Sequence, residues 1–141
     1  MGTNTCPVEK TIGTQKGFNL AKIALFFREH YPNDKDRLKV TCCEDHERPV
    51  LEIGAKTNTY AIRIVHENPT VLLEARRRNR KKNEPWFHAT VRLGSIQKTE
   101  FFSIQRSPRV MQYYVELTDT KGLLVRIYKD AFLVFSPAAQ E

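Results

Sequence analysis

Residues 71–93 read VLLEARRRNRKKNEPWFHATVRL, two segments with apolar residues on either side of a strongly polar run. Residues 71–76 and 86–93 carry apolar side chains with a period of two, which is typical of strands with one face on a core. The run between them is too short for a helical crossover, so the two strands should pair antiparallel. We therefore expect a long hairpin whose loop carries the polar run.

The same period of two continues on both sides of this hairpin. The predicted strands are residues 37–44, 49–54, 60–66, 71–76, 86–93, 98–104, 110–117, 123–128 and 132–135. Short connections with turn-forming residues separate them, which favours antiparallel neighbours. We expect a meander of about eight or nine strands, folded as a curled sheet, a half-open barrel or a sandwich.

A single helix is predicted before the strands, over residues 19–30. Asn19 is a favourable N-cap, and Pro32 ends the helical pattern. The apolar side chains that follow the helical period are Leu20, Ile23, Ala24, Phe27 and Tyr31. The fold class is therefore α+β and mainly β, with an N-terminal helix followed by the antiparallel meander. We expect one globular domain over residues 18–136, with a flexible lead-in at residues 1–17 and a flexible tail at residues 137–141.

The excess positive charge of the chain is concentrated in the loop of the first hairpin. The chain has 23 basic and 16 acidic residues, a net charge of +7, and six of the basic residues lie between Arg76 and Lys82. Without those six, 17 basic residues stand against 16 acidic ones, a net charge of +1. Charges in such a run need water or an anionic partner, because burying them unpaired is too costly.

Alternation along the strands places aromatic and cationic side chains together on the polar face of the sheet. The aromatic members are Trp86, Tyr114 and Tyr128, and the cationic members are Arg63, Arg92 and Arg126. Aromatic rings on such a face can stack on unpaired bases while nearby cations hold the backbone.

The sequence therefore predicts a non-enzymatic module that binds nucleic acid, with single strands favoured. The loop would grip phosphates and the aromatic face would stack on bases. The residues that we expect to take part are Arg76, Arg77, Arg78, Arg80, Lys81, Lys82, Trp86, Arg92, Tyr114, Arg126 and Tyr128.

Other functions remain open for the same features. The basic run can serve as a nuclear-import signal, beside a protein-interaction or assembly module that binds a protein partner or forms a homo-oligomer. That module would use an exposed strand edge or the second apolar side of the helix, formed by Leu25 and Phe26. Binding to an anionic membrane surface is the weakest alternative, because no firm apolar anchor accompanies the cations.

The sequence lacks the motifs that are typical of several enzymes, metal sites and targeting segments. The pattern contains no nucleophile elbow, phosphate-binding glycine loop or His-Glu-x-x-His motif, so we expect no enzymatic activity and no cofactor. Cys42, Cys43 and His46 form a Cys-x-x-His spacing, but no second ligand pair follows, so no metal site is expected. Reduced cysteines, no secretory signal and no apolar run of membrane-spanning length favour an intracellular protein of the nucleus or cytoplasm.

Overall fold

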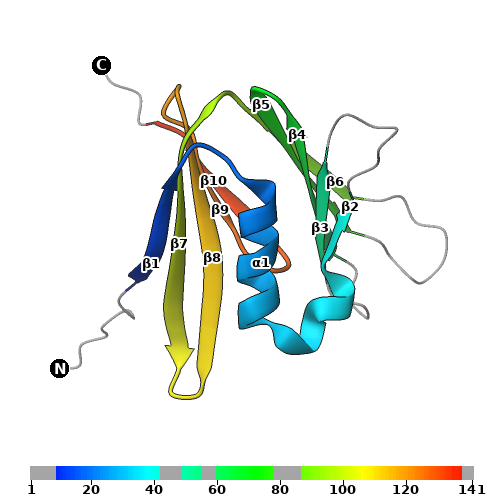
Figure 1. The fold of residues 1–141 in the computed structure, drawn as a ribbon, viewed down its shortest axis with the longest axis vertical. Coiled ribbons are helices and arrows are strands. Elements are labelled where there is room, and N and C mark those ends of the chain that lie inside the picture. The colour runs from blue at the N-terminus through cyan, green and yellow to red at the C-terminus, as the bar shows by residue number, and fades with distance from the viewer. Residues whose placement is uncertain (1–8, 42–48, 55–59, 78–86, 138–141) are drawn as a thin grey trace.

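The computed structural model describes residues 9–41, 49–54, 60–77 and 87–137. Ten strands form two antiparallel five-stranded sheets, with one α-helix lying between them (Figure 1). The sheets are separate and do not close into a barrel. The predicted class, mainly β with an N-terminal helix, is confirmed.

The terminal sheet contains the strands nearest the two ends of the chain. In spatial order its strands are β1 (Lys10–Lys16), β7 (Ile96–Ser107), β8 (Val110–Asp119), β9 (Leu124–Ile127) and β10 (Phe132–Phe135). The middle sheet follows chain order, with β2 (Lys39–Thr41), β3 (Val50–Gly54), β4 (Tyr60–Glu67), β5 (Thr70–Arg77) and β6 (Phe87–Leu93). The chain passes from one sheet to the other at Gly94 and Ser95, between β6 and β7.

All nine predicted strands are present as β2 to β10, and all neighbours in both sheets are antiparallel. Bounds agree to within a few residues, with differences in β2, which begins two residues later than predicted, and β7, which is longer. Residues 42–44 of the first predicted strand lie outside the described residues. Short connections favour antiparallel pairing of consecutive strands, and β6 and β7 are the exception. Gly94 and Ser95 join these two strands across different sheets, so the meander that we expected is divided in two.

Helix α1 (Leu20–His30) begins where the sequence predicts. The side chain of Asn19 accepts a hydrogen bond from the backbone N–H of Lys22 at 3.1 Å, which satisfies one of the free donors of the first turn. Pro32 then opens a short 3₁₀ helix, η1 (Pro32–Arg37), which the sequence did not predict. The buried face of α1 fills the space between the sheets, and its buried residues are Leu20, Ile23, Ala24, Phe26 and Phe27.

One prediction is wrong at the N-terminal end. Lys10–Lys16 forms strand β1, which pairs along β7, where we expected a flexible lead-in. The hydroxyl of Thr99 also donates a hydrogen bond to the carbonyl of Gly17, which ties the end of β1 to the sheet. Most β1 side chains are exposed, so the strand is held by backbone pairing and carries little apolar periodicity for a sequence reading to detect. Residues 1–8 and 138–141 lie outside the described residues.

Candidate nucleic-acid interface

The basic run begins at the end of the β5–β6 hairpin. Strands β5 and β6 pair antiparallel from Val71 opposite Leu93 to Arg77 opposite Phe87, as the predicted hairpin requires. Arg76 and Arg77 are therefore the last residues of β5. The remaining members of the run, Arg78, Arg80, Lys81 and Lys82, lie outside the described residues, as does Trp86.

Arg63 on the outer face of the middle sheet lies between two acids. Arg63 lies opposite Glu52 on one neighbouring strand and opposite Glu74 on the other. Its guanidinium nitrogens are 3.9 Å from a carboxylate oxygen of each. Charges of opposite sign therefore alternate across these three strands, and they balance one another in the part of the face around Arg63.

Arg92 on β6 is also paired with an acid. Its Nη1 donates a hydrogen bond to Glu67 Oε1, at the end of β4. Arg92 nonetheless remains half-exposed. Binding of a phosphate to Arg92 would compete with this carboxylate, so Arg92 is a weaker anion ligand than its position alone predicted.

Arg76 differs from these paired arginines. It lies on the same outer face as Glu74, two residues farther along β5, and is half-buried. Like the Nε of Arg63, its Nε is buried with no hydrogen-bond partner among the described residues, but unlike Arg63 it forms no ion pair with a described acid. The described base of the basic run thus presents a guanidinium that no acid of the described body neutralises.

The predicted exposure of Tyr114 is wrong. Its ring is fully buried on the outer side of the terminal sheet, stacked on Phe102 with ring centroids 5.2 Å apart and tilted against Tyr128 at 5.0 Å. Burial, with Glu9 and Glu116 nearby, raises the pKa of the Tyr114 hydroxyl. Alternation assigned this ring to the correct side of the strand, but it does not reveal whether other side chains cover that side. A buried ring has no free face for a base to stack on.

Arg126 belongs to the same covered cluster. Its Nε donates a hydrogen bond to Glu116 Oε2 at 2.9 Å, and its Nη1 donates to Glu9 Oε2 at 3.1 Å. The guanidinium carbon also lies 5.2 Å from the ring centroid of Tyr114 and 5.1 Å from that of Phe135. Two carboxylates and two rings thus occupy Arg126, and the expectation that it is free to assist base binding is not supported by its contacts. We call Glu9, Tyr114, Glu116, Arg126 and Phe135 the outer cluster.

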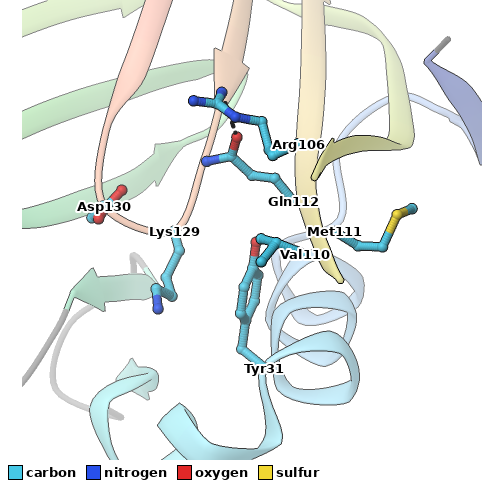
Figure 2. Close-up of a pocket in the computed structure, with 7 residues that line it drawn as sticks. All are labelled: Tyr31, Arg106, Val110, Met111, Gln112, Lys129 and Asp130. Atoms are coloured by element: carbon cyan, nitrogen blue, oxygen red, sulfur yellow. Dashed lines mark hydrogen bonds between the residues drawn. The ribbon is translucent and has the colours of Figure 1, made fainter. Parts of the chain in front are cut away.

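A recess that the sequence did not predict lies where the β7–β8 hairpin passes the end of α1 (Figure 2). Its volume is about 280 Å³, and it is lined by Tyr31, Arg106, Val110, Met111, Gln112, Lys129 and Asp130. Arg106 donates a hydrogen bond to Gln112 at 3.1 Å, and Lys129 Nζ lies 2.7 Å from Asp34. Burial raises the pKa of Tyr31, whose hydroxyl accepts a hydrogen bond from the backbone N–H of Tyr113 at 2.9 Å. Tyr31, Arg106, Gln112 and Lys129 therefore each have a partner within the protein.

A second recess of about 250 Å³ separates α1 from β1. Leu25 and Ile12 border it and are about half exposed, at 52% and 48%. Phe26 lies at its floor and is buried, with its ring centroid 4.8 Å from that of Phe101. The predicted second apolar side of the helix therefore consists of Leu25 alone, since Phe26 belongs to the core.

The described residues contain no group of three or more His, Cys, Asp or Glu side chains placed to hold a metal ion. Cys42, Cys43 and His46 are outside the described ranges. None of the described helices is long and apolar enough to cross a membrane. No family model, curated protein or solved structure matches this chain.

Proposed function

We propose that this protein is a non-enzymatic nucleic-acid-binding module that holds phosphates with the basic segment from Arg76 to Lys82. The observation that carries this proposal is the contrast between that segment and the rest of the molecule. The segment holds six positive charges within seven residues, while the remaining chain is close to neutral. A polyanion is the partner that such a concentrated charge attracts most strongly.

Ion pairing in the body supports this contrast. Beyond the arginines at positions 63, 92 and 126, Lys98 pairs with Glu100 at 3.7 Å and Lys129 pairs with Asp34 at 2.7 Å. Acids of the described body therefore pair with these five cations, whereas Arg76 has no ion-pair partner among the described residues. Together with the other five cations of the segment, Arg76 would make the end of the β5–β6 hairpin the densest positive charge of the molecule.

Binding through phosphates has recognisable properties. Release of counterions makes affinity fall steeply with salt, and the contacts carry no sequence information. Because Tyr114 and Arg126 are occupied within the outer cluster, the remaining candidates for stacking on a base are Trp86 and the half-buried Tyr128. Stacking of Trp86 gives the preference for single strands and leaves the charged contacts unchanged.

The test compares two variants with equal net charge. In the first, Arg76, Arg77, Arg78, Arg80, Lys81 and Lys82 are replaced by Gln. In the second, six exposed cations elsewhere, Lys10, Lys16, Lys22, Arg28, Lys39 and Lys121, are replaced by Gln. Each variant has a net charge of +1. Fluorescence anisotropy with a labelled single-stranded oligonucleotide at low salt should show binding by the intact chain and the second variant only.

The protein-interaction alternative has one observation in its favour, the half-exposed Leu25 and Ile12 that border the recess between α1 and β1. Under that function, the basic segment would be an import signal. Replacing the segment would then leave partner binding intact, and the purified protein would carry no nucleic acid. An elevated absorbance at 260 nm that is lost in a high-salt wash favours the nucleic-acid proposal instead.

A further inference from the structure

Strand β10 is an edge strand with apolar side chains exposed on both of its faces. Leu133 is 49% exposed, Val134 43% and Phe135 41%. Val134 lies opposite the buried Val125, on the side of the sheet that faces the core, whereas Leu133 and Phe135 lie on the outer side. Among the described strands β10 has a single neighbour, β9. Apolar strands of this kind are unusual at an uncovered edge, because they template pairing with another chain.

The other edges of the two sheets carry features that oppose such pairing. Strand β1 has a bulge between Thr11 and Gly13 and a lysine at each end. Strand β2 has three residues and begins with Lys39. Strand β6 contains Arg92. In contrast, β10 reads Phe-Leu-Val-Phe, with no charge, no proline and a regular register against β9. The edge of β10 therefore lacks the devices by which proteins usually keep strand edges apart.

The alternation of the β9–β10 ladder determines which backbone groups of β10 face away from β9. The N–H of Tyr128 donates to the carbonyl of Ala131 at 2.7 Å, at the start of the β9–β10 ladder. Hydrogen-bonded pairs alternate along an antiparallel ladder, so Leu133 and Phe135 direct their backbone groups toward β9. The N–H and C=O of Val134 consequently point to the open edge.

We propose that β10 pairs antiparallel with β10 of a second copy of this chain, about a two-fold axis at Val134. Residues opposite each other in a sheet share a face, so only registers that match like faces are allowed. The register centred on Val134 sets this residue against Val134 of the second copy and sets Leu133 against Phe135 of the second copy. All three exposed side chains then meet apolar partners, and both outward groups of Val134 are hydrogen-bonded. An isologous two-fold interface of this type closes after two copies and joins the two terminal sheets.

The interface is small. Pairing would bury on the order of 300 Å² of accessible surface per copy, from three half-exposed apolar side chains and one strand edge. A standard stable interface buries roughly 800 Å² per partner, so this one is smaller. The dimer should therefore be weak and in exchange with the monomer. Sedimentation of the intact chain, free of nucleic acid, should show the mass rising from 16.4 kDa toward twice that value between about 10 µM and about 1 mM.

A substitution at the axis tests the proposal. Val134→Lys sets two like charges opposite each other and should keep the protein monomeric over this whole range. Leu25→Lys is the matched control, since it adds the same charge at another half-exposed apolar position, and it should dimerise as the intact chain does. A monomeric intact chain, or a dimer that persists in Val134→Lys, overturns the proposal.

A crosslink tests the register without relying on that variant. With Cys6, Cys42 and Cys43 replaced by Ser, Val134→Cys sets two thiols on Cα atoms about 5.5 Å apart, within the range for a disulfide. Mild oxidation should give a covalent dimer. The same substitution at Ile12, on the edge of β1, should give none. Absence of the Val134→Cys crosslink, or an equal yield from Ile12→Cys, excludes β10 pairing centred on Val134.

Discussion

Replacing Arg126 by methionine should destabilise the protein without weakening its binding to nucleic acid. Arg126 donates hydrogen bonds to Glu116 and Glu9 at 2.9 and 3.1 Å, and the Glu116 side chain is only 10% exposed. Methionine keeps an apolar chain over the rings of Tyr114 and Phe135 but removes the charge. The variant therefore leaves the Glu116 carboxylate in the outer cluster without its cation.

The expected loss of stability depends on how far Arg126 and its two acidic partners are exposed to water. Removing one partner of a fully buried ion pair costs about 3–5 kcal/mol, because the remaining charge stays desolvated. The Arg126 side chain is 27% exposed and that of Glu9 is 30% exposed, so water screens part of the interaction. We expect a loss of about 2 kcal/mol in the free energy of unfolding. Adding Glu116→Gln to this variant should recover about half or more of the loss, because no buried carboxylate then lacks a partner.

Urea-induced unfolding measures both variants by linear extrapolation to water. A loss below about 0.5 kcal/mol for Arg126→Met would show that solvent screens these pairs as it does at an exposed surface. Oligonucleotide affinity, measured on the folded variant at the same salt concentration, should equal that of the intact chain. A decrease as large as that caused by replacing the basic segment would refute the assignment of Arg126 to the outer cluster and return it to the binding surface.

Three further predictions concern stability. Tyr114→Phe should change the free energy of unfolding by less than about 1 kcal/mol in a urea titration, because the buried hydroxyl lies near Glu9 but makes no hydrogen bond of normal geometry with a described residue. Tyr114→Ala should lower it by about 3–5 kcal/mol; a large loss from Tyr114→Phe would mean that the hydroxyl is firmly bonded to Glu9. Asn19→Ala should cost about 1 kcal/mol by removing the helix cap, and Asn19→Asp, which keeps the acceptor, should cost little. Burial lowers the pKa of His66, so the unfolded chain binds the proton more tightly than the folded chain does. The free energy of unfolding should therefore be highest above about pH 6.5 and should fall as the pH drops below that value. His66→Gln should make the free energy of unfolding depend less on pH in this range.

Local patterns predicted the elements well because local physics determines them. Asn19 starts the helix by capping it, and Pro32 ends the helical pattern because proline has no backbone N–H donor. Both effects depend only on neighbouring residues. The nine strands followed from a period of two and from short connections. Strand β1 was missed because its stability comes from backbone pairing with β7, which is distant in the sequence.

The candidate site was predicted less completely, because exposure depends on the whole fold. The face of Tyr114 could be read from alternation along β8. The cover formed by Phe102 on β7, Arg126 on β9 and Tyr128 directly after β9 comes from both sides of β8 and is visible only in the folded sheet. The partners of Arg126 include Glu9, which is 117 residues away in the sequence. In contrast, the concentration of charge in the basic segment is a property of the sequence itself and remains the basis of the proposed function.

The salt dependence of binding tests this claim most directly. For six cations on a single strand, the logarithm of the affinity should fall against the logarithm of salt concentration with a slope of about −4. The variant that lacks the six exposed cations elsewhere should keep that slope, and the variant that lacks the basic segment should have a slope near zero with little affinity left. Equal slopes for the two variants, or an intact chain that does not bind at low salt, would contradict the proposal that the segment from Arg76 to Lys82 holds the nucleic acid.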